Sequence, residues 1–131
     1  MILIMRIAAA LVFVIAAVVP GVAHHSFSGE FDANQPIKLR GVIKKVDWMN
    51  PHIWYFVEVK NADGSITTWG LSGGAPGQLQ RRGIMKSQLK LGATVVVEGF
   101  RARDGSNNGF GRSVTYEDGQ SVFTANQQDR Q

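Results

Sequence analysis

Hydrophobic and polar residues alternate along much of the chain after residue 36, which is the pattern of strands with one buried face. The clearest example is the segment 52–60, whose alternate positions carry Ile53, Tyr55, Val57 and Val59. Successive side chains of a strand point to opposite faces of a sheet, so these side chains should face a core. Comparable patterns predict strands at residues 37–48, 65–71, 94–103, 112–116 and 120–124.

Turn-forming residues separate the predicted strands. Residues 61–64, Asn-Ala-Asp-Gly, predict a hairpin turn, and the glycine-rich segment 72–77 interrupts the sheet. Residues 78–82 predict one or two helical turns that end at Gly83. Gly41 interrupts the first strand, where we expect a bend at a β-bulge.

This order of elements predicts an all-β fold: three strands, a short helical connector, then two or more strands. It indicates a small five- to six-stranded Greek-key barrel of the oligonucleotide/oligosaccharide-binding (OB) type. A small β-sandwich is the alternative, because it can be built from the same number of short strands. Neither fold by itself indicates a function.

The amino terminus has the pattern of a secretory signal peptide. One positive charge, at Arg6, precedes the apolar run 7–19, and small residues stand at Gly21 and Ala23, before the expected cut. As a helix this run rises only about 20 Å, short of the roughly 30 Å of a bilayer core. We therefore expect cleavage after Ala23, a periplasmic or secreted protein, and no stable membrane span in the processed chain.

The chain is expected to contain one folded domain. Residues 1–23 form the predicted signal peptide, 24–36 an extended lead-in segment, 37–124 the barrel and 125–131 a flexible tail. The net charge of +4 is small, and its signs are interspersed, which argues against nucleic acid as a partner. Cysteine is absent, so thiolate metal sites and disulfides are excluded and packing must hold the fold.

All three histidines lie in two short motifs, the pair His24-His25 and the sequence Trp-Met-Asn-Pro-His-Ile-Trp around His52. Cleavage after Ala23 would make His24 the first residue. Its amine and imidazole could then chelate one Cu(II), completed by an imidazole from His25 or His52. Cleavage one residue earlier would place His25 third, where the amine, two backbone nitrogens and its ring form a copper or nickel chelate. The alternative is a polar terminus that binds no metal.

Aromatic residues next to His52 are candidates for binding a ligand or a partner. Trp54 and Phe56 share with His52 the strand face that points away from the predicted core. Such residues could form a shallow ligand platform on the barrel's second strand. The alternative is that the turn before the strand bonds its own backbone and that both rings pack under the lead-in segment.

A basic pair, Arg81-Arg82, follows the predicted helical turn, with Lys86 and Lys90 nearby. An anion, an acidic partner or a phospholipid headgroup could bind there. The alternative is a solvated helix face.

Five short motifs follow one another along the chain. They are Ala23-His24-His25-Ser26-Phe27, Gly41, Trp48-Met49-Asn50-Pro51-His52-Ile53-Trp54, Arg81-Arg82-Gly83 and Val97-Glu98-Gly99-Phe100. In this order they resemble a group of small exported bacterial proteins that share a domain of unknown function. The resemblance implies an exported single-domain protein with a barrel-like β fold. It implies no activity, so no catalytic residue is carried over.

No enzyme class is indicated by the remaining motifs. The glycine-rich segments fit neither a nucleophile elbow nor a phosphate loop, and zinc would need further ligands such as Glu30 or Asp32. The first hypothesis is a periplasmic copper-binding protein. The second is an interaction module that binds an envelope protein or a small ligand through its aromatic face. A copper oxidase is a weaker third, because no acid/base pair is visible.

Overall fold

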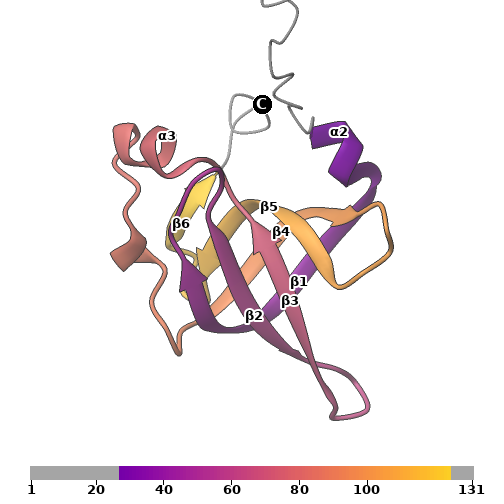
Figure 1. Cartoon of the computed structure of the whole chain (residues 1–131). Coiled ribbons are helices and arrows are strands. Elements are labelled where there is room, and N and C mark those ends of the chain that lie inside the picture. Colours follow the sequence, from indigo (N-terminus) through magenta and orange to yellow (C-terminus); the bar gives the residue numbers. More distant parts are fainter. Residues whose placement is uncertain (1–26, 125–131) are drawn as a thin grey trace, which may run out of the picture.

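The structure is a computed structural model, and it describes residues 27–124 (Figure 1). Strands dominate this part of the chain, and within it no helix is long and apolar enough to cross a membrane. In chain order the elements are α2 (Phe27–Glu30), β1 (Phe31–Asp47), β2 (Trp54–Lys60), β3 (Ile66–Ser72), α3 (Pro76–Arg81), the 3₁₀ turn η1 (Lys86–Gln88), β4 (Thr94–Ala102), β5 (Asn108–Tyr116) and β6 (Ser121–Thr124).

The strands form one sheet in the order β3-β2-β1-β4-β5-β6, and each of these neighbouring pairs is antiparallel. A parallel pairing between β3 and β5 joins the sheet to itself, with Gly70, Leu71 and Ser72 opposite Asn108, Gly109 and Phe110. Five strands therefore close into a ring, and β6 lies outside it on β5. The predicted all-β barrel with a helical connector is confirmed, and the closure excludes the sandwich.

The core has the residues that the alternation of β2 predicted. Ile53, Tyr55 and Val57 are fully buried, whereas Trp54 and Phe56 on the other face are half-buried. The rest of the main cluster comes from the other strands and from the connector between β3 and β4: Leu39, Ile43, Leu71, Leu79, Ile84, Leu89, Val95, Val97, Val114, Val122 and Phe123.

Strand β1 is longer than the sequence predicted, because it begins at Phe31 rather than at Ile37. Residues 33–36 are all exposed, so the start of the strand lacks the alternation of buried and exposed positions from which a strand is predicted. Its irregularities lie between Phe31 and Pro36 and between Ile43 and Lys45, so the bulge predicted at Gly41 is misplaced. Gly41 serves a different purpose, since a Cβ there would collide with the backbone of β2.

The helical connector closes one side of the barrel. Pro76 begins α3, where a missing N–H costs nothing, and Gly83 follows it with a φ of 76° that favours glycine. Leu79, Ile84 and Leu89 enter the core from this segment. The predicted helical turn is confirmed, and its apolar side explains why it packs there.

A tyrosine hydroxyl lies inside the barrel without a hydrogen-bond partner among the described residues. Tyr55 is fully buried, its ring meets Phe123 edge-on, and burial raises the pKa of its hydroxyl strongly. A Cβ at Gly111 would overlap this hydroxyl. Tyr55 and β5 therefore fit together only because residue 111 has no side chain.

These contacts predict opposite effects on stability for two substitutions. Gly111→Ala should lower the free energy of unfolding by about 3 kcal/mol, because the overlap displaces a packed strand. Tyr55→Phe should leave it unchanged or raise it by about 1 kcal/mol, because it removes an unsatisfied polar group. Urea denaturation followed by circular dichroism measures both.

The double variant, with Tyr55→Phe and Gly111→Ala together, tests whether overlap with the tyrosine hydroxyl causes the loss of stability. Tyr55→Phe removes the atom that the alanine methyl meets first, so it should recover at least about 1 kcal/mol of the loss from Gly111→Ala. Additive effects in the two backgrounds would contradict this account of the contact.

Candidate functional site

Within the segment expected as a lead-in, residues 27–30 form the helical turn α2, which aromatic contacts fix to the barrel. The ring of Phe27, in α2, lies 5.5 Å from Phe31, 5.9 Å from Phe100 and 5.1 Å from Phe110, measured between centroids. The contacts with Phe100 and Phe110 are edge-to-face, the arrangement that aromatic rings favour. Together with Ala102 these rings form a second, smaller core.

Hydrogen bonds to the β4–β5 hairpin hold the same turn. The backbone N–H of Arg103 donates to the carbonyl of Glu30 over 2.9 Å, and its guanidinium Nε donates to the carbonyl of Ser28 over 2.6 Å. The chain is therefore anchored to the barrel from Phe27 onward. The sequence contained a signal for this in Phe27 and Phe31, but not the position of their partners.

A groove of about 590 Å³ lies beside this anchor, and we call it the Trp54 groove. Trp54 stands at the start of β2 and contributes one wall, while α2 and the β4–β5 hairpin contribute the others. The groove is lined by Gly29, Glu30, Phe31, Trp54, Ala102, Arg103, Asp104 and Asn108. Trp54 and three residues of the lead-in segment, Gly29, Glu30 and Phe31, thus line the same groove.

The groove carries both signs of charge. Hydrogen bonds from Ser106 lower the pKa of Asp104, so this carboxylate is anionic at neutral pH. Arg103 and Glu30 also line the groove. Asp32, the other proposed zinc ligand, accepts hydrogen bonds from Asn34 and Gln35, which lower its pKa. It serves a local turn and does not line the groove.

His52 lies two residues before Trp54, in the turn that joins β1 to β2, and follows the cis Asn50-Pro51 bond. Its side chain is half-buried, and no hydrogen bond or ion pair to another residue of 27–124 is recorded for it. His24 and His25 lie outside the described residues. Within 27–124 no three His, Asp or Glu side chains gather as a metal-binding group.

The remaining predicted residues do not join the groove. Phe56 lies further along β2, and the ammonium of Lys45 stands 5.2 Å from its ring centroid. Arg81 is exposed at the end of α3, and the guanidinium of Arg82 donates to the carbonyl of Thr124. Figure 1 shows α3 and α2 on opposite sides of the molecule, so the two arginines belong to a different surface.

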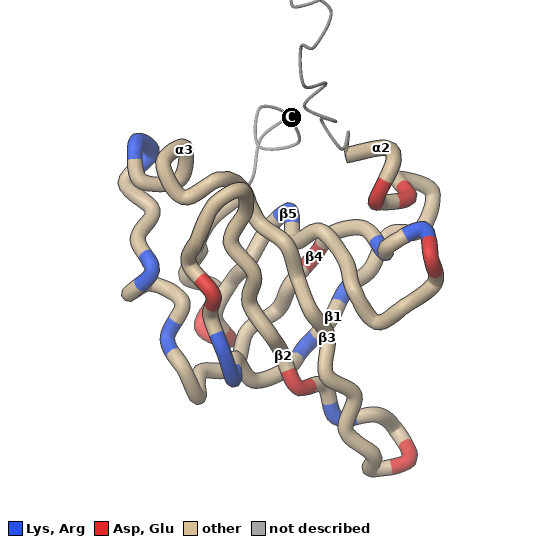
Figure 2. The backbone as a smooth tube through the Cα atoms, viewed as in Figure 1, with Lys and Arg blue, Asp and Glu red and all other residues tan. Residues whose placement is uncertain are grey.

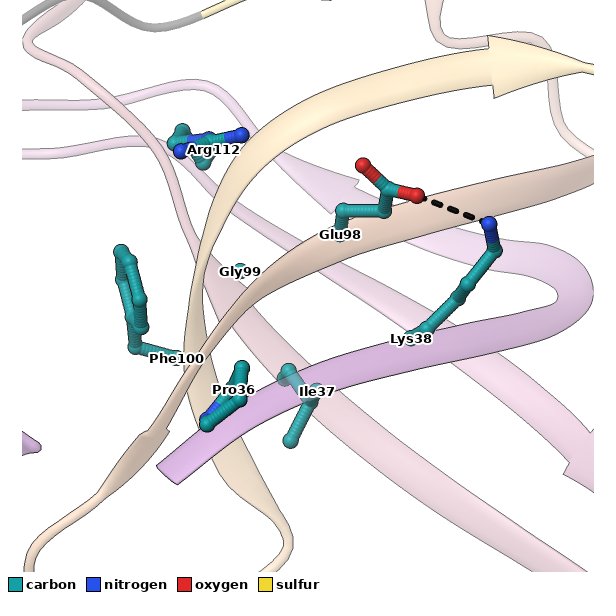
Figure 3. Close-up of a pocket in the computed structure, with 7 residues that line it drawn as sticks. All are labelled: Pro36, Ile37, Lys38, Glu98, Gly99, Phe100 and Arg112. Carbon is teal, nitrogen blue, oxygen red and sulfur yellow. Dashed lines mark ion pairs between the residues drawn. The ribbon is translucent and has the colours of Figure 1, made fainter. Parts of the chain in front are cut away.

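A second depression, of about 350 Å³, was not predicted from the sequence (Figure 3). Pairing of β1 with β4 sets Pro36 opposite Phe100 and Lys38 opposite Glu98. The Lys38 ammonium bonds Glu98 over 2.9 Å, which lowers the pKa of that carboxyl. Arg112, from β5, completes a charged rim over an apolar floor. Only the register of three strands brings these residues together.

Comparison with known proteins assigns a family. Residues 10–112 match the model of the family of unknown function DUF6152. No curated protein and no solved structure matches the chain. The expectation of a domain of unknown function is confirmed over the greater part of the chain.

The anchor of α2 predicts a local effect of Phe27→Ala. Loss of the ring contacts should release the turn, so the Arg103 amide, which is bonded to Glu30, should exchange its hydrogen at least about tenfold faster. Hydrogen exchange followed by NMR measures this.

Phe56→Ala is the matched control, since it removes a half-buried ring outside the groove. It should leave exchange at Arg103 unchanged. Equal acceleration in both variants would mean that α2 has no specific anchor.

Proposed function

The chain belongs to the family of unknown function DUF6152, and we propose that it is an exported periplasmic protein that binds copper. The ligands in this proposal are the amine and imidazole of His24, the imidazole of His25 and that of His52. The observation that carries it is the Trp54 groove, because it is lined by α2, which follows the histidine pair in the sequence, and by the start of β2, which follows His52.

The histidine pair is joined in sequence to α2, which lines the groove. His25 stands two residues before Phe27, so its Cα lies within about 7 Å of the anchored residue, and that of His24 within about 11 Å. Gly29 and Glu30, which follow Phe27 directly, line the groove. A short tether of this kind raises the local concentration of the histidine pair beside the barrel.

His52 is joined in sequence to the start of β2, which also lines the groove. Trp54 lines it, and His52 is only two residues away in the sequence. An imidazole with no recorded partner in the described barrel is available to a metal. Nitrogen ligands from a terminal amine and imidazoles suit Cu(II), whose preferred tetragonal geometry they can fill. Glu30 and Asp104 add negative charge nearby, offset in part by Arg103.

The proposal predicts the products of export and their affinity for copper. Mass spectrometry of the exported protein should find His24 at its amino terminus, because this ligand set needs a free His24 amine. That protein should bind one Cu(II), with nitrogen-dominated hyperfine structure in electron paramagnetic resonance. His24→Ala should weaken binding by at least about a hundredfold and His52→Ala by about tenfold, because each removes a nitrogen ligand.

Two controls separate this chelate from adventitious binding. Acetylation of the terminal amine should abolish tight binding, whereas Asn61→Ala, in the distant β2–β3 hairpin, should not change it. Unchanged affinity in the His24→Ala and acetylated proteins would overturn the proposal, as would a mature chain that still begins at Met1.

A second candidate function rests on the shape and lining of the same groove. Trp54 offers an aromatic wall beside the charges of Glu30, Arg103 and Asp104, which suits a segment of an envelope protein or a small polar ligand. In this version the protein is an interaction module, and the metal has no part in binding.

This alternative predicts site-specific crosslinking in cells. A photoreactive residue in place of Trp54 should give one discrete adduct, and one in place of Ile66, which is 56% exposed in the β2–β3 hairpin, should not. Adducts of the same size from both positions would show that contact is not confined to the groove. Removal of copper should leave the Trp54 adduct unchanged.

A further inference from the structure

The segment between β3 and β4 is basic throughout. Residues 76–93 contain Arg81, Arg82, Lys86 and Lys90 and no acidic residue. Figure 2 shows their positions following one another along the connector, next to a further basic stretch at the end of β1. The rest of the described barrel shows basic and acidic positions more closely mixed, so this surface is distinct.

The connector also exposes apolar side chains. One side of it enters the core through Leu79 and Leu89, but Met85 is 47% exposed and Leu91 is 66% exposed. Leu91 is the most exposed large hydrophobic residue recorded for residues 27–124. The connector therefore presents apolar surface at Met85 and Leu91 within a basic segment.

Between the connector and β1 lies a depression of about 670 Å³ with the same two properties. Its lining combines four lysines and one aspartate with apolar side chains. The residues are Lys44, Lys45, Val46, Asp47, Lys86, Ser87, Leu89, Lys90 and Leu91. We call this depression, together with Met85, the connector face.

The charge of this face is only partly neutralised. Lys44 pairs with Glu58 over 3.3 Å, and Lys45 pairs with Asp47 over 2.7 Å. Lys86 and Lys90 form no ion pair with any residue of 27–124, although the ammonium of Lys90 stands 5.6 Å from the ring centroid of Tyr116. The face therefore presents two uncompensated cations next to exposed apolar side chains.

We propose that the connector face docks on the surface of an anionic phospholipid bilayer. Lys86 and Lys90 bind phosphate groups, while Leu91 and Met85 enter the boundary between headgroups and acyl chains. Lysine stems lie along apolar surface and keep their charge in water, so the two functions are compatible on one face. A soluble acidic protein would use the cations but leave Leu91 without a role. This docking is independent of the proposed copper site.

Binding to vesicles tests the proposal. The full chain should partition more strongly into phosphatidylcholine vesicles that contain phosphatidylglycerol than into phosphatidylcholine alone, and added salt should remove the difference. Lys86→Gln with Lys90→Gln should lower the partition into anionic vesicles about fivefold for each lysine. Any binding through the apolar run 7–19 is the same in the parent and the variant and in both kinds of vesicle, so it does not affect the comparison.

A matched variant carries the same change in charge elsewhere. Lys60→Gln with Arg112→Gln removes two exposed cations that form no recorded ion pair, on β2 and β5, and should leave partition within about twofold of the parent. Leu91→Ser keeps the charge and should weaken partition several-fold. Circular dichroism should show the same fold for every variant.

The outcomes that overturn the proposal are distinct from those that overturn copper binding. Equal partition into neutral and anionic vesicles would overturn it, as would an equal loss in the matched variant. A Leu91→Ser protein that binds like the parent would show a general anion-binding patch rather than membrane docking. Competition by soluble polyglutamate at equal charge would assign the face to an acidic protein.

Discussion

Closure of the barrel through the parallel pairing of β3 and β5 is the constraint on which the other features depend. This pairing brings Gly70 beside Asn108 and Leu71 beside Gly109, although nearly forty residues separate them in the chain. The two strands lie close together here, since a Cβ at Gly70 would lie 2.5 Å from the side-chain oxygen of Asn108. The closed ring buries Tyr55 and sets the start of β2 near the β4–β5 hairpin, where the Trp54 groove forms.

The second core extends the barrel at the groove. Phe27 and Phe31 bring aromatic rings from the amino-terminal side onto Phe110, and Arg103 bonds the same turn through its backbone and side chain. Burial of several rings stabilises a helical turn far too short to be stable alone. The consequence is positional, because these contacts hold α2 at one place beside the groove.

The molecule has two surfaces that differ in their charged residues and in their exposed apolar residues. The Trp54 groove mixes acidic and basic side chains around an aromatic wall, which suits a ligand with polar groups or a metal. The connector face combines lysines with exposed Leu91 and Met85, which suits an extended anionic surface. In the two proposals, one chain holds a ligand at one surface and contacts a membrane at another, with the barrel between them.

The local sequence alone determined the number and approximate positions of the strands, the buried face of β2 and the helical connector. The alternation of residues 52–60 predicted the buried Ile53, Tyr55 and Val57, because side-chain direction in a strand depends only on position. Tertiary structure decided the early start of β1, the bulge near Ile43 and the groove around Trp54. These features depend on contacts between distant segments, whose register no local pattern contains. For the same reason the sequence indicated separate aromatic and basic candidates, and only the closed barrel divided them between two surfaces.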